Sequence, residues 1–238
     1  MGRVVTDMAA NDPTVTITAG VDIDTKKQNN YPVYTTPGDI TEAADVLLDF
    51  SIPSALEGIL KYALSIKIPI ILCATGYSQE QLADIEKAST QIPVFRSGNM
   101  SLGINLLADL IKRACIVLGE DFDIEIVERH HRRKVDAPSG TALMLADAAA
   151  DVLPEKPEYI YERESKRKPR SKNEIGISAV RGGTIVGVHD VIFAGQDEII
   201  ELRHTAASRD VFATGAIKAA KYMKNKHPGM YNMMDLLR

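Results

Sequence analysis

The sequence predicts an α/β protein, with a doubly wound parallel sheet in a first domain and a mixed or antiparallel sheet in a second, α+β domain. Two observations predict this architecture. Short apolar runs alternate with helical patterns through the first hundred residues, which is typical of a parallel sheet covered on both faces. Longer strands follow after residue 119, and the first alternates strictly between polar and apolar residues.

The first domain begins in a helix. Residues 1–10 place apolar side chains at helical spacing, and an Asn-Asp-Pro sequence then ends the pattern. Pro53 and the capping-box pair Ser78 and Gln81 mark two further helix starts. Four short apolar runs are expected to be strands, with two helices between them: strands 15–21, 45–50, 69–73 and 92–96, and helices 53–66 and 78–90.

The second domain begins with a long amphipathic helix over 101–118, which ends at Gly119. Glycine-rich sequences at 182–183 and 195–197 predict hairpin turns between strands. The other elements expected there are strands 123–129, 174–181, 184–193 and 198–205 and helix 140–153, and a last amphipathic helix follows over 209–225. The expected domains are 1–101 together with 212–238, and 102–211.

Composition narrows the class of protein. The 238 residues carry a net charge of −4, which does not favour nucleic acid as a partner of the whole molecule. Cys73 and Cys115 each lie in an apolar run, so we expect buried thiols and a reducing, cytoplasmic compartment. The chain has no apolar run of membrane-spanning length, so no membrane span is expected.

A basic segment, 162–174, carries six cationic side chains and no apolar residue. We expect a mobile, solvated loop here. Contact with a neighbouring subunit or with an acidic ligand stays open as an alternative. Nucleic-acid binding is not favoured, because no aromatic residues lie among the charges.

Three loops follow strands of the first domain and suit a nucleotide cofactor. They are rich in small or polar residues, so their backbone amides can approach a ligand closely: 21–27, 73–77 and 96–101. Asp22 follows a strand at the position where an acid binds the adenosine ribose, although a turn or capping role explains it equally well. A dinucleotide-binding unit of the Rossmann type also needs a first strand and a glycine loop, and neither precedes residue 1.

Segment 128–153 contains the highest density of candidate functional residues. Five consecutive cationic or titratable side chains lie a few residues before a capped helix: His130, His131, Arg132, Arg133 and Lys134. Ser139 or Thr141 can cap that helix, whose N-terminus suits a carboxylate or phosphate. Two anion-binding elements so close together indicate a ligand with two anionic groups. A solvated basic turn before an ordinary helix is the alternative. No metal site is expected, because adjacent strand residues point to opposite faces.

Residues 128–142, ERHHRRKVDAPSGTA, closely resemble the E-x-H-H-x-x-K-x-D-A-P-S-G-T-A signature of the dihydrodipicolinate reductase family. The resemblance extends to four other segments and so to essentially the whole chain: DVLLDFSIPSA, CATGY, SGNMSLGIN and the C-terminal FATGAIKAAKYMKNKHPGMYNMMDLL. It implies a Rossmann cofactor domain, an α+β substrate domain and a homotetramer built on the second domain's sheet. The implied reaction is hydride transfer from NADH or NADPH to C4 of a cyclic dicarboxylate, with loss of its 4-hydroxyl as water.

The resemblance also implies roles for individual residues. His130 corresponds to the catalytic general acid–base, and Lys134 to a second catalytic group that donates a proton and holds a substrate carboxylate. His131 corresponds to a substrate contact, and Gly140 and Thr141 to the site of the other carboxylate. Cofactor contacts are implied at Met1, Asp22, Cys73, Ala74, Thr75, Ser97, Gly98, Asn99 and Met100.

Two departures from the family pattern matter. Ile23 follows Asp22 where some members carry an arginine for a 2′-phosphate, which favours NADH, and Lys26 and Lys27 leave dual use open. The chain also begins at the final Met-Gly of the family's G-x-x-G-x-M-G motif. We therefore expect a truncated or misassigned start, with the substrate site whole and the cofactor site compromised. The alternatives are a cofactor-deficient dicarboxylate-binding paralogue and an inactive truncated form.

Overall fold

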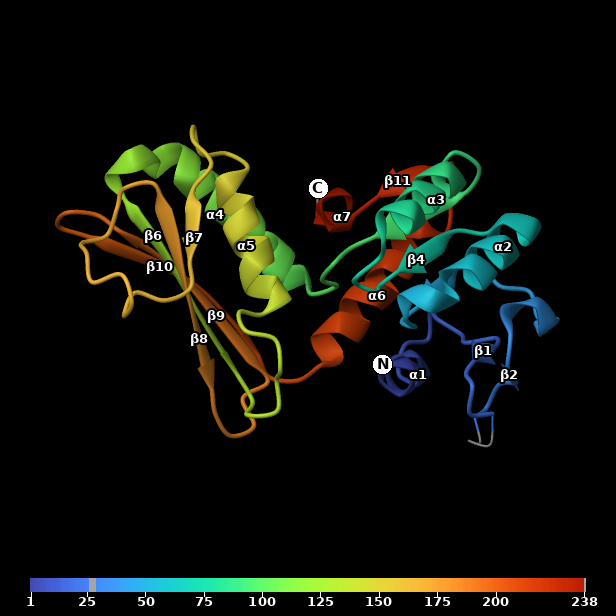
Figure 1. The fold of residues 1–238 in the computed structure, drawn as a ribbon. Coiled ribbons are helices and arrows are strands. Elements are labelled where there is room, and N and C mark those ends of the chain that lie inside the picture. The colour runs from blue at the N-terminus through green and yellow to red at the C-terminus, as the bar shows by residue number, and fades with distance from the viewer. Residues whose placement is uncertain (26–28, 238) are drawn as a thin grey trace. The chain divides into compact units, whose positions relative to one another are not determined.

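The computed structural model describes residues 1–25 and 29–237 (Figure 1). The chain forms two compact units, unit 1 comprising Met1–Ser101 with Asp210–Arg238, and unit 2 comprising Leu102–Arg209. Each has its own sheet and its own apolar core.

Unit 1 is built on a parallel sheet with the strand order β11-β5-β4-β3. Its strands are short and mostly buried, as the apolar runs predict: β3 (Leu47–Asp49), β4 (Ile70–Leu72), β5 (Pro93–Arg96) and β11 (Gly229–Tyr231). Sequence analysis missed β11, because its three residues lie in a glycine- and tyrosine-containing tail with no apolar run. The α/β class expected for this half is confirmed.

The helices described in unit 1 are α1 (Gly2–Ala10), α2 (Leu56–Ile66), α3 (Gln79–Ser89), α6 (Asp210–Met223) and α7 (Met233–Leu237). The first four lie where the sequence predicts helices, whereas α7 was not predicted. Short 3₁₀ turns occupy Pro37–Asp39 and Pro53–Ala55. Ser78 and Gln81 form the expected capping box at the start of α3. Apolar faces of α2 and α3 bury Leu60 and Ile85 against the sheet.

The strand predicted at 15–21 is largely wrong. Only β1 (Gly20–Val21) is a strand, and it pairs with β2 (Val33–Tyr34) in a separate two-stranded parallel sheet. Within the described residues β3 pairs only with β4, so residues 14–19 have no ladder beside them. The apolar side chains of that run pack instead with Val5 of α1. The apolar run correctly indicated side chains that pack in the interior. A strand also needs a neighbouring strand to satisfy the hydrogen bonds of its backbone, and residues 14–19 have none among the described residues.

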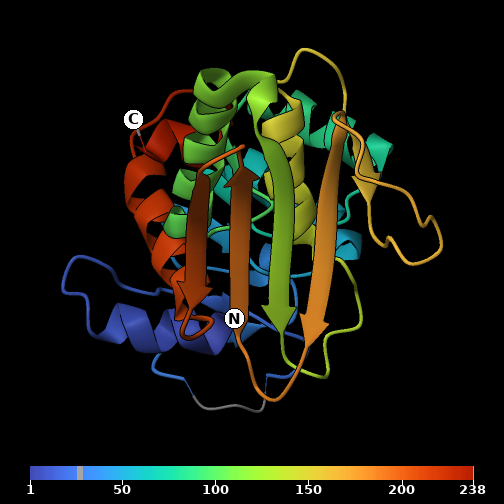
Figure 2. The same ribbon diagram turned by 90° about the vertical axis from the view of Figure 1, so that its left-hand side faces the viewer.

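Unit 2 contains a five-stranded mixed sheet with the order β10-β9-β6-β8-β7. Its strands are β6 (Asp123–His130), β7 (Glu158–Ile160), β8 (Glu174–Arg181), β9 (Gly187–Ala194) and β10 (Ile199–Ala206). Helices α4 (Leu102–Leu118) and α5 (Gly140–Ala150) cover one face, and a 3₁₀ turn at Gly119–Asp121 leads into β6. Figure 2 shows the opposite face of this sheet, which no helix of unit 2 covers.

The hairpin predicted at 182–183 is wrong, whereas the one at 195–197 is confirmed. β8 and β9 do not pair with each other, because β6 lies between them, parallel to β8 and antiparallel to β9. The glycine turn therefore crosses the end of β6, where the N–H of Gly182 donates to the carbonyl of His130. Turn residues predict that the chain reverses direction, but they do not predict whether another strand lies between the two strands that the turn connects.

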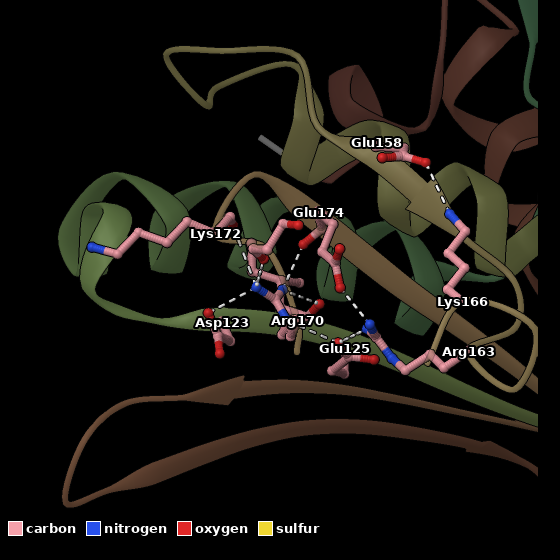
Figure 3. A network of polar contacts seen from close by, with 10 residues as sticks. Asp123, Glu125, Glu158, Arg163, Lys166, Arg170, Lys172 and Glu174 are labelled. Atoms are coloured by element: carbon pink, nitrogen blue, oxygen red, sulfur yellow. Dashed lines mark hydrogen bonds and ion pairs between the residues drawn. The ribbon is translucent and has the colours of Figure 1, made fainter. Parts of the chain in front are cut away.

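The basic segment is held against the sheet rather than solvated throughout (Figure 3). Arg163 pairs with Glu125 and Glu174, and Arg170 donates to Asp123, Glu125 and four backbone carbonyls. A Cβ at Gly176 would lie 1.8 Å from a Glu125 carboxylate oxygen, so a larger residue there would displace that carboxylate and disturb its pairs with the arginines. The expectation of a free loop therefore fails for both arginines, because the outer face of β6 supplies acidic partners.

Gly215 allows α6 to approach the loop that precedes α4. A Cβ at this position would lie 1.7 Å from the carbonyl oxygen of Met100, so we expect Gly215→Ala to lower the free energy of unfolding by about 1–3 kcal/mol. Gly58→Ala in α2 is the matched control, since its Cβ would meet no atom within 4 Å. That control should be neutral or stabilising by up to about 1 kcal/mol. Urea denaturation measures both, and equal effects would contradict the close approach.

Candidate active site

Strand β6 delivers two titratable side chains to the interior of unit 2. Its strict alternation places Ile124, Ile126, Glu128 and His130 on the buried face. The two isoleucines belong to the core beneath α4 and α5. Glu128 and His130 continue the same row to the end of the strand, so the polar site is a direct extension of the apolar core.

The Glu128 carboxylate is fully buried and accepts four hydrogen bonds. Both terminal nitrogens of Arg181 donate to it at 2.7 Å, one to each oxygen. The Ser139 N–H donates at 3.0 Å, and Nδ1 of His130 lies 2.6 Å from Oε2. Burial raises the pKa of Glu128, but the hydrogen bonds from Arg181 and His130 outweigh it and hold the pKa below its usual value.

Ser139 joins this cluster to the start of α5. Its hydroxyl accepts from the N–H of Ala142, as an N-cap does, and lies 3.0 Å from Nε2 of His189. Of the two expected capping residues, Ser139 is therefore the one that caps. The rings of His130 and His189 meet edge to face with centroids 5.1 Å apart. Burial and the nearby His130 lower the pKa of His189 to about 4, so this ring is neutral near pH 7.

The loop between β6 and α5 holds the predicted lysine. Nζ of Lys134 lies 2.8 Å and 2.9 Å from the two carboxylate oxygens of Asp136, whose pKa that hydrogen bond lowers. Gly140 and Thr141 form the first turn of α5, directly after the cap. The lysine and the helix N-terminus therefore belong to one short segment, as their spacing in the sequence predicts.

A cationic hollow of about 420 Å³ lies beside this loop. It is lined by His131, Arg133, Thr184, Val186 and Arg209. Nδ1 of His131 is buried and has no hydrogen-bond partner in the described part of the chain. Two guanidinium groups and an unsatisfied imidazole nitrogen suit an anion. His131 is the predicted substrate contact, whereas sequence analysis did not single out Arg209, which follows a strand more than seventy residues later.

The predicted cofactor residues lie in unit 1, at the carboxyl ends of its parallel strands. Cys73, Ala74 and Thr75 follow β4 directly, and Thr75 is exposed. Burial raises the pKa of the Cys73 thiol, and the thiol is only half-buried rather than buried as expected. Cys115, in α4, is buried, and burial raises its pKa to about 11.

The second loop predicted to contact the cofactor follows β5 and is held by its own hydrogen bonds. The Ser97 hydroxyl donates to the carbonyl of Asn99 at 2.7 Å, and the Asn99 amide oxygen accepts from the N–H of Ser101 at 2.8 Å. Asn99 and Met100 are buried, whereas Gly98 is exposed. Of the predicted residues in this loop, Ser97 and Gly98 are the ones with exposed surface for a ligand.

Asp22 is exposed after β1, and one of its oxygens accepts from the N–H of Asp24 at 2.9 Å. The turn role that the sequence left open is therefore present, and the Asp22 side chain is exposed. Met1 is the N-cap of α1 and makes no side-chain cap hydrogen bond. Lys26 and Lys27 lie outside the described residues. Small, exposed loop residues and an exposed acid thus fit a nucleotide in this unit.

Three residues of the polar cluster, Glu128, Arg181 and His189, were not predicted as site residues. Glu128 stands two positions before His130, so strand alternation alone could have placed both on one face. Arg181 and His189 come from β8 and β9, where the register pairs them with His130 and Glu128 respectively. No signal in the sequence predicts those pairings. In the described residues no group of His, Cys, Asp or Glu is arranged to hold a metal ion.

Comparison with known proteins agrees with these observations. Profiles described as Dihydrodipicolinate reductase, N-terminus and C-terminus, match residues 1–100 and 103–237. The chain is 54% identical over 238 residues to the 4-hydroxy-tetrahydrodipicolinate reductase of Caldanaerobacter subterraneus subsp. tengcongensis, covering 100% of this chain and 94% of that protein. It is 52% identical over 237 residues to the enzyme of Clostridium tetani, covering 100% of this chain and 92% of that protein.

The structure resembles the dipicolinate-bound dihydrodipicolinate reductase from Paenisporosarcina sp. TG-14, with a TM-score of 0.80 and 22% identity. The match covers 97% of this chain and 92% of that one, and at this identity it shows the fold. The two family matches and the relatives over the full chain place the protein among NAD(P)H-dependent oxidoreductases, with a Rossmann-like unit joined to a mixed-sheet unit. The chain belongs to the dihydrodipicolinate reductase family, and its activity is the reduction of 4-hydroxy-tetrahydrodipicolinate in lysine biosynthesis.

No helix in the described part of the chain is both long enough and apolar enough to cross a membrane.

The depressed pKa of His189 predicts a pH-dependent stability. Between about pH 4 and the ordinary histidine value of 6.5, the unfolded chain binds a proton that the folded chain does not. The unfolding free energy of the wild type should therefore fall, relative to His189→Gln, by up to about 3 kcal/mol as the pH falls through this window. Urea denaturation at several pH values measures it. His227→Gln, at an exposed histidine, should give no such pH-dependent difference.

Proposed function

We propose that His130 is the general acid–base of this reductase and that Lys134 is a second proton donor. The observation that carries the proposal is the hydrogen bond of His130 to the buried Glu128 carboxylate. A histidine held in this way keeps one ring nitrogen for proton exchange with substrate. Departure of the 4-hydroxyl as water consumes one proton, which His130 or the Lys134 ammonium can donate. NAD(P)H, when bound, supplies the hydride.

The substrate we propose is a cyclic dicarboxylate, and separate elements of unit 2 support it. Lys134 provides one cation for a carboxylate, now neutralised by Asp136. Gly140 and Thr141 offer the amides of the first turn of α5 to the other carboxylate. His131 lines the hollow with Arg133 and Arg209, which adds positive charge for an anionic substrate.

For the cofactor we propose that NADH is preferred over NADPH. Asp22 supports this, because an exposed carboxylate at the end of β1 can accept from ribose hydroxyls and repels a 2′-phosphate. The exposed, apolar Ile23 beside it offers no positive charge to that phosphate. Nicotinamide contacts are proposed for Cys73, Ala74 and Thr75. Ser97, Gly98, Asn99 and Met100 form the second proposed loop, and Met1 the start of α1 at the pyrophosphate.

We further propose a cytoplasmic homotetramer built on the open face of the five-stranded sheet. That face presents Val180 and Ile199, which are 44% and 66% exposed. It also carries Asp190, which pairs with Arg129 and Arg203 and is nearly inaccessible. Exposed apolar side chains together with paired charges suit a contact between copies of the chain.

Lys134→Ala tests the catalytic proposal. We expect kcat to fall by about 10²–10⁴-fold with the fold intact, because a proton donor and a carboxylate partner are lost together. Steady-state kinetics and circular dichroism measure the two properties. Lys112→Ala is the matched control, since Lys112 makes an equivalent 2.8 Å pair with Asp151 on the surface. Near-normal turnover of Lys134→Ala would rule out the assigned role.

Asp22→Asn tests the cofactor preference. Loss of the carboxylate should raise KM for NADH several-fold and lower the KM ratio of NADPH to NADH, because repulsion of the 2′-phosphate is removed. Initial rates with both cofactors measure the ratio, and Asp24→Asn controls for a general change of local charge. An unchanged ratio in Asp22→Asn would contradict ribose binding by this acid. Failure of the wild type to bind either cofactor would favour the cofactor-deficient alternative.

The assembly is tested by light scattering. A homotetramer should have four times the 26.0 kDa mass of one chain. We expect Val180→Glu to lower this mass by placing an acid on the open sheet face, whereas Ile116→Glu, on the exposed side of α4, should not. A dimeric or monomeric wild type would contradict the proposal.

A further inference from the structure

Nδ1 of His130 lies 2.6 Å from the carboxylate of Glu128, which Arg181 binds in turn, and neither Glu128 nor Arg181 lines the cationic hollow. We propose that Glu128 and Arg181 are positioning residues: Arg181 fixes the Glu128 carboxylate, and that carboxylate keeps a proton on Nδ1 of His130. Nε2 is then the atom that exchanges a proton with substrate. This inference rests on the acid–base role proposed above for His130.

The sheet register places the three side chains together. His130 pairs with Arg181 across β6 and β8, while Glu128 stands two residues earlier on the same buried face of β6. Arg181 is held in turn by the carbonyl of Asp136 at 2.7 Å and by its neighbour's carbonyl at 2.8 Å. These two hydrogen bonds hold the Arg181 guanidinium in the position from which it binds the Glu128 carboxylate.

The hydrogen bonds determine which group donates to which. Arg181 donates to both oxygens of Glu128 at 2.7 Å, in the two-point geometry of a guanidinium–carboxylate pair. The carboxylate is therefore ionised and has no proton to give, so at 2.6 Å Nδ1 of His130 must be the donor. In the neutral ring this leaves Nε2 as the nitrogen with a lone pair.

Burial makes the arrangement rigid. Glu128 is 0% exposed, so water does not compete for its lone pairs. Gly187 lies beside the other side of the ring, where a Cβ would come within 3.1 Å of Nε2 and 3.5 Å of Cδ2. A glycine at this position leaves space at Nε2, the nitrogen that the tautomer makes available.

A pH profile of kcat/KM tests the positioning role. In Glu128→Gln the imidazolium form of His130 loses its neighbouring negative charge. The part of the kcat/KM profile that falls as the His130 imidazolium loses its proton should therefore move to lower pH by about one unit or more. We expect kcat to fall at least tenfold as well. Glu128→Asp keeps the charge, so this part of its profile should stay in place and part of the rate should return.

Two further variants separate the roles. Glu125→Gln is the matched control, because Glu125 is a second β6 glutamate that pairs with two arginines, Arg163 and Arg170, on the opposite face (Figure 3). It should leave the profile unchanged. His130→Asn tests the proposed function itself. If His130→Asn loses activity while Glu128→Gln keeps the wild-type profile, the positioning role is wrong and the acid–base role stands. Wild-type turnover in His130→Asn would overturn the acid–base role.

A spectroscopic measurement on the wild type does not depend on the variants folding. With ¹⁵N-labelled histidine, NMR should show the neutral His130 ring protonated at Nδ1. In Glu128→Gln, where that variant folds, the proton should redistribute between the two nitrogens. A neutral wild-type ring protonated at Nε2 would overturn the inference.

Discussion

Glu128 brings a negative charge into the interior of unit 2, and the geometry around it follows from the need to satisfy that charge. A buried carboxylate without partners would be strongly destabilising. Here it accepts from an arginine on β8, a histidine on its own strand and the backbone ahead of α5. One side chain thus ties together the end of the sheet, the basic loop and the helix start. We interpret the site as a polar extension of the buried core rather than as a group of residues on the surface.

The same strand carries a second charge network on its other face. Glu125 joins Arg163 and Arg170 to the sheet, so the basic segment is anchored where its composition alone predicts a free loop (Figure 3). The two networks differ in exposure. Glu128 is inaccessible, whereas the Arg163 side chain is 43% exposed. Solvent screening makes the outer pairs weaker, so they suit anchoring of a loop, while the inner one suits control of a proton.

Unit 1 is organised by its short parallel strands. β4 and β5 each end in a loop rich in small or polar residues, and α6 packs so closely on the loop after β5 that Gly215 admits no side chain. The Ser97–Ser101 loop is further held by its own serine and asparagine hydrogen bonds. A nucleotide at these loops, as proposed above, would require no large rearrangement of them. Their small side chains are a requirement of packing as much as of ligand contact.

The sequence by itself determined the α/β class, the main helices with their caps and the dense segment 128–142, because these depend on local periodicity and on motif chemistry. It also placed His130 and His131 on different sides of the chain. It misjudged strand 15–21 and the turn at 182–183, and it missed Arg181, His189 and Arg209 as part of the site. Each of these depends on which strand lies beside which, and pairing is a long-range choice that local pattern does not encode. Only the tertiary structure decided that the arginine at the end of β8 lies opposite His130 and binds Glu128, because β6 lies between two strands that the sequence suggests are neighbours.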